Sequence, residues 1–451
     1  MAEQQQSTAP GVATTNRRMG FLAVLGVWTN WFFWASAVKG LAVMLPTLQD
    51  QMDTNTWVIG WMIVVVEVTA NLIGPMAAPL GRCFGIGACV MVSGLMMGVA
   101  FIIASFSSAV VMATVLAVLA GPGIGISNVL CKELLSRCFT SGSTTTAFSI
   151  SQTGSSVAFI VMPPLTQLFL DTYGWRGAML LLGSIFFHLT VCGALLQCPS
   201  VNALAAHKTG TDYSALPDDS SEEGHQHSVD EDASRESVKQ ENNSILSGLQ
   251  TAWQLFLTRL LTSRAYWCVA VISIVTNVST LGWAVYFVPH TLTKGFDPGD
   301  AVTLTSIMGL TRVLAGVILG PVMDKIQIVG NKEFVGIALT SMTVYYAVDP
   351  WLTSYWLNVA VVVIYACSNC MMLALQDVLL CEIVPSDCLG SAFGWIAMKS
   401  AVFSFFLLYL PGLIFDLGGS YTIPFLLMGG LHFFAIAAVL FLVFKVDSEA
   451  D

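Results

Sequence analysis

The chain has 451 residues, of which 55% are hydrophobic and only 10% are charged, whereas soluble domains carry about 25% charged residues. Its mean hydropathy is +0.74, and its net charge of -10 has the wrong sign for a nucleic-acid partner. This composition excludes a soluble enzyme and a nucleic-acid-binding protein, and it indicates a polytopic membrane protein.

Apolar stretches long enough to cross a membrane, which takes roughly 20 residues, fall into two sets of six. The first set predicts helices at 20–46, 57–80, 84–106, 109–131, 145–170 and 177–197. The second set predicts helices at 266–290, 301–323, 334–349, 354–381, 390–414 and 422–444. The predicted fold class is therefore an all-α membrane protein with twelve transmembrane helices in two six-helix halves.

The stretch between the two sets is polar and rich in acidic residues. Such a composition cannot bury enough apolar surface to fold alone, so we predict a disordered acidic linker, with an interfacial helix at 246–261 leading into the second half. The predicted organisation is an N-terminal tail at 1–19, a six-helix bundle at 20–198, the linker at 199–264, a second bundle at 265–445 and a C-terminal tail at 446–451.

The distribution of basic residues predicts the orientation, because cytoplasmic loops carry an excess of Lys and Arg. With both termini and the linker in the cytoplasm, only Arg176 and Lys294 of the 18 Lys and Arg residues fall in outer segments. A glycosylation sequon at 242–244 favours the opposite side for the linker. A three-residue pattern often matches by chance, so we expect both termini to be cytoplasmic.

Cysteine and histidine spacing indicates neither a disulfide scaffold nor a metal site nor a catalytic centre. The 11 cysteines lie in apolar runs or in segments assigned to the cytoplasm, where thiols stay reduced. Cys367 and Cys370 form a Cys-x-x-Cys pair without a second pair or a nearby His, so we interpret both as buried thiols. The 6 histidines show no ligand or triad spacing. We therefore expect no metal, no cofactor and no enzymatic activity.

Motifs in both halves carry information beyond hydropathy. They are residues 149–156, Met162-Pro163-Pro164-Leu165, Tyr173-Gly174-Trp175-Arg176-Gly177, Gly121-Pro122-Gly123-Ile124-Gly125, Gly390-Ser391-Ala392-Phe393-Gly394 and residues 416–421. Together they resemble the monocarboxylate transporters of the major facilitator superfamily, over residues 20–197 and 266–444. The resemblance implies the major facilitator fold, with a site at the bilayer midplane between the halves. It also implies a carrier in the plasma membrane and, as for some relatives, a single-span escort protein.

Two basic residues within predicted spans are the candidates for holding a carboxylate. Arg312 lies near the middle of span 301–323, about 15 Å from either end, so it needs a cavity or a partner. It matches the family's span-eight arginine, which binds the substrate carboxylate, and a guanidinium suits a carboxylate through paired hydrogen bonds. Lys39 lies where the family carries a lysine that works with substrate and proton. The alternatives are a structural ion pair for Arg312 and snorkelling to the membrane surface for Lys39.

Departures from the family pattern concern proton coupling. One helical turn before Arg312, proton-coupled members carry an aspartate, and this chain has Met308. The basic cluster expected at the start of span five and the acidic signature expected before span one are also missing. These departures indicate a divergent member and leave proton coupling open.

Two carboxylates within spans, Glu67 and Asp377, are candidates to replace that aspartate. A carboxyl group removed from water can remain protonated near neutral pH, and a nearby cation opposes this. We hypothesise that Glu67 balances Lys39 or Arg312 as a counter-ion and carries a coupled proton. The alternative is that it is a static partner for a buried base.

Polar and aromatic residues at mid-span complete the expected binding site. Asn71 and Asn277 are predicted to face the cavity, with buried helix–helix hydrogen bonding as the alternative. Trp34, Phe148 and Trp283 are predicted to contact the apolar part of the substrate.

The segment Gly320-Pro321-Val322-Met323-Asp324-Lys325 resembles the superfamily's cytoplasmic loop motif. An Asp near a helix N-terminus and a basic neighbour can latch the two halves. We therefore predict a cytoplasmic gate formed by Arg82, Asp324 and Lys325, with a charged helix end at the membrane surface as the alternative.

The sequence thus predicts an alternating-access secondary transporter, in the lipid bilayer, of monocarboxylates or related small carboxylate-bearing solutes. The first alternative is a facilitative carrier of amino-acid-like zwitterions, of the aromatic amino acid or creatine type. The second alternative is a non-transporting receptor homologue, because a protein that no longer transports could also lack the family residues that are missing here.

Overall fold

The computed structural model describes residues 10–52, 56–139, 143–196, 250, 253–254, 259–326 and 329–446. Most of the predicted linker at 199–264, including the sequon and most of the predicted interfacial helix at 246–261, lies outside the described residues, as do residues 1–9 and 447–451.

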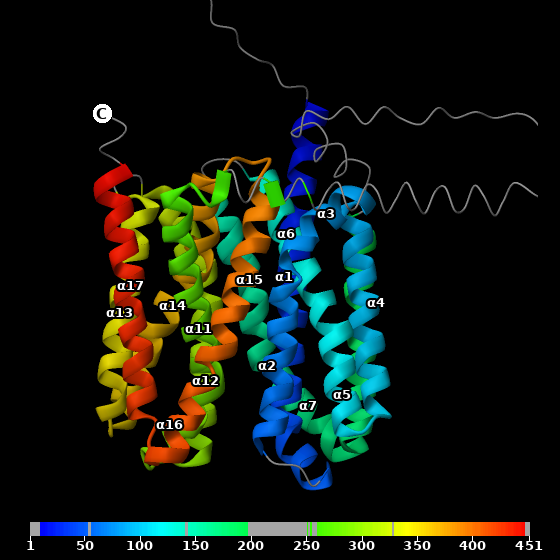
Figure 1. Cartoon of the computed structure of the whole chain (residues 1–451), viewed down its shortest axis with the longest axis vertical. Helices are drawn as coiled ribbons and strands as arrows, with labels where there is room; N and C mark the ends of the chain where they lie inside the picture. The colour runs from blue at the N-terminus through cyan, green and yellow to red at the C-terminus, as the bar shows by residue number, and fades with distance from the viewer. Residues whose placement is uncertain are drawn as a thin grey trace, which may run out of the picture.

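The described part of the chain is helical throughout and forms two halves that stand side by side (Figure 1). The first half consists of α1 (Pro10–Met52), α2 (Thr56–Leu72), α3 (Gly74–Phe84), α4 (Ile86–Ser105), α5 (Ala109–Val115), the π-helical turn η1 (Leu116–Ala120), α6 (Gly121–Cys138), α7 (Thr144–Phe186) and α8 (His188–Leu196). The second half consists of α11 (Arg264–Thr293), α12 (Pro298–Lys325), α13 (Asn331–Val348), the 3-10 turn η3 (Asp349–Trp351), α14 (Tyr355–Ile383), α15 (Leu389–Leu407), α16 (Leu410–Gly418) and α17 (Thr422–Val446).

Each of the twelve predicted spans falls on a described helix. Nine helices within the described residues are long and apolar enough to cross a membrane, and a tenth span is the pair Val64–Leu72 and Gly74–Phe84, which bends by 53°. One of these nine, the stretch Thr144–Leu196 formed by α7 and α8, carries two of the predicted spans, which are separated by the kink at Gly174 within α7. The remaining predicted span corresponds to α13, which has 18 residues and starts with Asn331, Lys332 and Glu333.

Glycine and proline explain where these helices break. Gly174 has a φ of 69°, in the left-handed region that favours glycine, and it separates two helical stretches within α7. Pro75 stands at the first turn of α3, where its missing N–H costs nothing, and this is the point of the α2–α3 bend. The π-helical turn η1 directly precedes Gly121-Pro122, because a proline inside a span disrupts the regular hydrogen-bond ladder.

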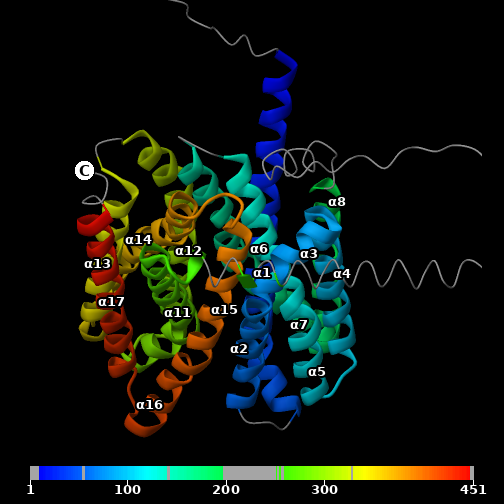
Figure 2. The ribbon, with the colours of Figure 1, turned by 45° about the horizontal axis from the view of Figure 1, so that its top comes forward.

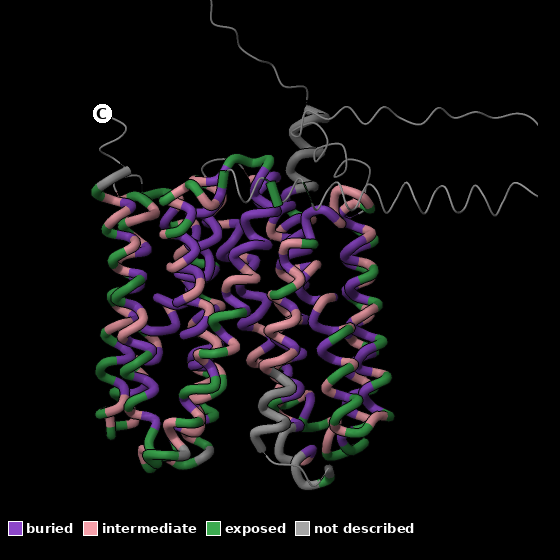
Figure 3. The backbone as a smooth tube through the Cα atoms, viewed as in Figure 1, coloured by how far each residue is buried: buried purple, intermediate pink, exposed green. Residues whose placement is uncertain are grey.

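Exposed residues lie along the outer faces of both halves (Figure 3), and many of them are large and apolar. Examples are Val110, Phe406, Phe433, Phe434 and Phe444, each more than 60% exposed. An apolar surface of this extent needs lipid around it. The protein is therefore a multi-pass membrane protein.

The two halves touch through a small set of helices. α12 packs on α7, and α15 packs on α2 and α3. Two views of the ribbon show α15 beside α2 (Figure 1, Figure 2). Glycines permit these close contacts: a Cβ at Gly316 would lie 3.0 Å from the carbonyl oxygen of Ser149, and one at Gly74 would lie 2.5 Å from that of Gly394. Small residues let backbones approach in this way where helices meet in lipid.

The described ends of the chain, at the start of α1 and the end of α17, lie on the same side of the molecule (Figure 1). We call this the terminus side. Six hydrogen bonds join described residues of the two halves, and these six lie between this side and Ser155 of α7. The structure is therefore closed on the terminus side.

Candidate substrate-binding site

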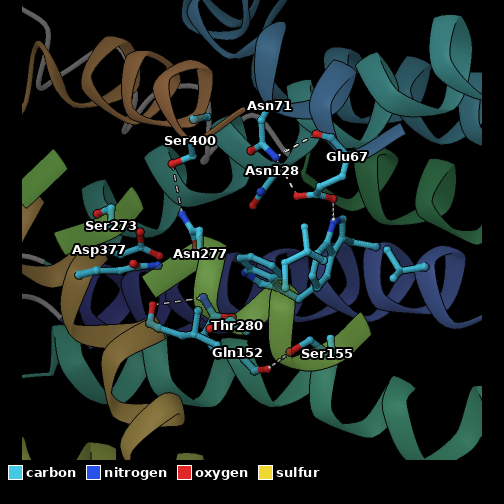
Figure 4. A pocket seen from close by; sticks show the side chains of 18 of the residues that line it. Glu67, Asn71, Asn128, Gln152, Ser155, Ser273, Asn277, Thr280, Asp377 and Ser400 are labelled. Atoms are coloured by element: carbon cyan, nitrogen blue, oxygen red, sulfur yellow. Dashed lines mark hydrogen bonds between the residues drawn. The ribbon is translucent and has the colours of Figure 1, made fainter. Parts of the chain in front are cut away.

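A cavity lies between the two halves, and helices of both halves line it (Figure 4). The volume open to the centres of water-sized molecules is about 110 Å³, enough for several waters, since one water needs about 10–15 Å³ of such volume. Its lining is mostly apolar, with charged and amide side chains interspersed. This is the composition expected of a small-molecule site.

Arg312 reaches this cavity because of its place on α12. It stands three residues after Gly309 and four before Gly316, so all three lie on one helix face. The two glycines let that face pack on α7, and the guanidinium then lies beside Ser155, whose Oγ accepts a hydrogen bond of 3.4 Å. The side chain is only 3% exposed.

Arg312 has no carboxylate within 4.0 Å among the described residues, and its Nε has no hydrogen-bond partner there. A buried charge in such a position is costly unless an anion or water compensates it. The expected alternative of a structural ion pair is therefore absent from the described part of the chain.

Lys39, on α1, lies close to the same place. Its Nζ is 4.8 Å from the ring centroid of Phe159, and the Cζ of Arg312 is 5.7 Å from that centroid. Lys39 also has no ion pair or hydrogen bond within the described residues and lines the cavity. Two cations around one aromatic ring repel each other, and a carboxylate beside both would relieve that repulsion.

Phe159 is a site residue that the sequence reasoning missed. It stands one helical turn after Ser155, so the two share a face of α7. The signal available in the sequence was its position three residues after the end of the motif at 149–156.

Glu67 lies in the cavity wall, but it is not paired with either cation. Its Oε2 accepts a hydrogen bond of 2.8 Å from Trp34 Nε1, and its Oε1 accepts one of 2.7 Å from Asn71 Nδ2 (Figure 4). The described residues show no ion pair between Glu67 and Lys39 or Arg312, so the hypothesised counter-ion contact is not present in this conformation.

Further expected residues also reach the cavity. Asn277 lines it and donates a hydrogen bond of 3.5 Å to Ser400 (Figure 4). Trp283 lines it as well, and its Nε1 donates to the hydroxyl of Tyr345 at 2.9 Å. Met308, at the position of the missing aspartate, presents an apolar side chain to the cavity.

Phe148 does not belong to this group. It is 1% exposed and is absent from the cavity lining. The prediction failed because position 148 packs within the helix bundle at the start of α7, three turns away from Phe159.

Asp377 does line the cavity, but its partner is an unexpected one. Its Oδ2 lies 3.0 Å from the Nζ of Lys132. The sequence predicts a cytoplasmic position for Lys132, because it directly follows the predicted span at 109–131. The structure puts Lys132 within α6, because the helix extends to Cys138, beyond the predicted end at 131. This ion pair joins the two halves.

The predicted gate residues lie on the terminus side. Arg82 donates to the carbonyl oxygen of Asp387 at 3.3 Å, which links α3 to the α14–α15 loop. The Oδ2 of Asp324 accepts from the backbone N–H and the hydroxyl of Thr146, at 2.8 and 2.5 Å, and so caps the first turn of α7 from the other half. Lys325 is exposed and makes no ion pair or hydrogen bond within the described residues.

No group of three or more His, Cys, Asp or Glu side chains in the described part of the chain could hold a metal ion. The cavity instead offers two cations that have no carboxylate partner among the described residues, a hydrogen-bonded carboxylate and several amides. Chemically, this arrangement can bind a small organic anion.

Comparisons with known proteins agree with this architecture. The profile described as Major Facilitator Superfamily matches residues 20–402. Monocarboxylate transporter 12 of Rattus norvegicus is 26% identical over 425 residues, which cover 91% of this chain and 82% of that protein. Monocarboxylate transporter 2 of Rattus norvegicus is 22% identical over 393 residues, covering 87% and 76%. Monocarboxylate transporter 11 of Homo sapiens is 32% identical, but only over 160 residues, or 35% of this chain and 34% of that protein.

Among solved structures, a proton:xylose symporter bound to 6-bromo-6-deoxy-D-glucose aligns with a TM-score of 0.67 at 13% identity, covering 96% of both chains. At this identity the likeness shows the fold alone. Together, these findings confirm the predicted fold class, the resemblance noted in the sequence and a carrier in place of an enzyme.

Proposed function

Because this chain belongs to the Major Facilitator Superfamily and is a divergent relative of the monocarboxylate transporters, we propose that it carries monocarboxylates or related small carboxylate-bearing solutes by alternating access. One observation supports this above all: the buried Arg312 and the half-buried Lys39 both lie around Phe159 without an anionic partner among the described residues. A substrate carboxylate would supply the missing charge, and the apolar wall with Trp283 would contact the remainder of the solute.

The proposal is tested by uptake into proteoliposomes containing the purified protein. Radiolabelled lactate, pyruvate, aromatic amino acids and creatine are offered with and without a pH gradient. We expect saturable uptake of at least one carboxylate-bearing solute, and stimulation by the same unlabelled solute inside the vesicles. Uptake with no saturation and no counterflow would instead favour a non-transporting receptor homologue.

Arg312→Ala is expected to abolish this uptake while the protein still folds and inserts. Arg312→Lys is expected to lower it roughly tenfold or more, because lysine keeps the charge and loses the paired hydrogen bonds. Arg264→Ala is the matched control, since Arg264 is exposed at the terminus-side end of α11 and does not line the cavity. Normal uptake by Arg312→Ala would contradict the proposed site.

A second candidate substrate class has its own supporting observation. Glu67 exposes a carboxylate to the cavity, and within the described part of the chain its side chain accepts hydrogen bonds from the neutral groups of Trp34 and Asn71 alone. A zwitterion whose ammonium or guanidinium group reached Glu67 while its carboxylate met Arg312 would neutralise both. Competition between lactate and an amino-acid-like solute in the uptake panel distinguishes the two classes.

We further propose that the protein resides in the plasma membrane with both termini in the cytoplasm. The excess of Lys and Arg in the segments on the terminus side supports this orientation. An escort by a single-span protein is a part of the proposal that follows from the family resemblance, whereas proton coupling through Glu67 is a part that follows from its place in the cavity wall.

A further inference from the structure

The ion pair between Lys132 and Asp377 connects the two halves inside the substrate cavity. Lys132 belongs to α6 and Asp377 to α14, and the side chains are 13% and 7% exposed. The Nζ of Lys132 also lies 5.2 Å from the ring centroid of Trp31 in the first half and 5.8 Å from that of Phe393 in the second. The pair is therefore held in aromatic surroundings where water screens it little.

The pair lies deeper toward the terminus side than Arg312. Lys132 and Asp377 each stand six residues before the ends of their helices, at Cys138 and Ile383, which is about 9 Å at 1.5 Å per residue. Arg312 stands 13 residues before the end of α12 at Lys325, or about 20 Å. A carboxylate that leaves Arg312 for the terminus side must therefore pass Lys132.

Opening the terminus side separates α6 from α14 and pulls Lys132 away from Asp377. Asp377 is the only carboxylate paired with Lys132 among the described residues, and a buried cation that loses such a partner is strongly destabilised. Lys132 avoids this destabilisation if another anion takes the place of Asp377. Asp377 itself is rehydrated, because water enters the widening cavity. A substrate carboxylate has the chemistry to do this.

We propose that Lys132 is a second carboxylate-binding station, which the substrate occupies in exchange for Asp377, and that this exchange unlatches the terminus side. The proposal rests on the proposed function. In it, binding of the substrate in the same cavity releases the ion pair and so allows the carrier to change orientation. The exchange does not need the aspartate that proton-coupled relatives carry at the position of Met308.

The first consequence is that the loaded carrier reorients faster than the empty one. In proteoliposomes, exchange of a labelled carboxylate against the same unlabelled carboxylate inside should be several-fold faster than net uptake. K132Q/D377N removes the latch and should bring the ratio of the two rates close to one.

A matched control is available in the second half. Lys294 and Asp349 form another Lys–Asp pair at 3.5 Å, but both belong to the second half and neither lines the cavity. K294Q/D349N changes the same chemical groups and should leave the ratio of rates as in the parent protein. An equal fall of the ratio in both double variants, or no fall in K132Q/D377N, would overturn the proposal.

The single variants distinguish a station from a static ion pair. D377N frees Lys132 from its competitor, so the half-saturating concentration of the carboxylate should fall, roughly tenfold for one charged hydrogen bond gained. K132Q should not lower it. A static pair would make the two variants change in the same direction, and this comparison remains decisive if the double variant fails to fold.

A readout that needs no substrate separates this proposal from the proposed function. Cys381 stands one helical turn after Asp377 toward the terminus side and is partly exposed. In a protein that keeps only this cysteine, labelling by a membrane-impermeant maleimide from the terminus side should be slow in the parent and at least several-fold faster in K132Q/D377N. Equal labelling rates would refute the latch, whatever the uptake panel finds. Absence of carboxylate uptake together with faster labelling would refute the carboxylate station and leave only the ion pair as a gate.

Discussion

At the scale of single residues, charges in the cavity decide what the protein can hold. Arg312 and Lys39 share the ring of Phe159, and Met308 leaves α12 without the aspartate that would neutralise one of them. The site is therefore more positive than in a relative that carries that aspartate. The carboxylate in the wall that has no ion-pair partner among the described residues is Glu67, which two neutral donors hold in place.

Glu67→Gln tests whether this carboxyl group carries a proton. If it does, the variant should lose the component of uptake that a pH gradient drives, because the amide keeps the shape and cannot exchange a proton. Asn71→Ala removes a neighbouring hydrogen bond but no titratable group, and should keep the pH dependence. The measurement is initial uptake rate against external pH. Full rate and unchanged pH dependence in Glu67→Gln would end the proton hypothesis.

Much of the cavity could be anticipated from the sequence because charges and amides inside apolar spans are few. Arg312, Lys39, Glu67, Asn71 and Asn277 were selected for that reason, and all line the cavity. Aromatic side chains gave no such signal, because they are as suitable for packing as for binding. Phe148 was therefore chosen wrongly, and Phe159 was missed.

At the scale of helices, the two halves stabilise each other's ends. Ser143 at the start of α7 provides no side-chain cap, and Asp324 from the end of α12 caps Thr146 in its place. The carboxylate also interacts favourably with the positive end of the helix dipole. This contact can form only while the terminus side is closed.

Asp324→Ala is expected to weaken the closed state by about 0.5–2 kcal/mol, the usual worth of an N-cap, which is roughly a two- to thirtyfold shift toward opening. Lys325→Met should shift it less, because Lys325 is exposed. The rate of Cys381 labelling from the terminus side measures both. A larger effect for Lys325→Met than for Asp324→Ala would contradict this assignment.

The positions of the helices could be predicted from hydropathy, but the length of one of them could not. The bend between α2 and α3 and the kink at Gly174 fall at glycine and proline, where a break can be expected. The length of α6 could not be predicted, because its last turns carry Lys132 and Arg137 and read as a cytoplasmic loop. A contact with Asp377 of α14 stabilises Lys132 within the bundle, and an ion pair with Glu133, one turn earlier on α6, stabilises Arg137.

At the scale of the whole molecule, closure of the terminus side depends on backbone contact between the halves. A Cβ at Gly74 would meet the carbonyl oxygen of Gly394, and one at Gly394 would meet that of Gly74. Neither backbone can move away cheaply, because each belongs to a packed helix. The closed arrangement therefore needs glycine at both positions.

Gly394→Val should disfavour the closed arrangement by about 1–3 kcal/mol, the usual cost of overpacking. This corresponds to roughly a five- to 150-fold change in the balance between the two orientations. Faster labelling of Cys381 and slower net uptake are expected together. Gly418→Val is the control, because a Cβ there meets nothing within 4 Å. Unchanged labelling in Gly394→Val would show that the contact is not limiting.

The charges that line the cavity also determine how the carrier responds to membrane voltage. With Glu67 ionised, Lys39, Arg312 and Lys132 exceed Glu67 and Asp377 by one positive charge, and one bound carboxylate cancels it. An electric field therefore acts on the unloaded carrier and not on the loaded one, with about 2.3 kcal/mol per charge for every 100 mV. A potassium diffusion potential across the vesicle should change net flux and leave one-for-one exchange unaffected.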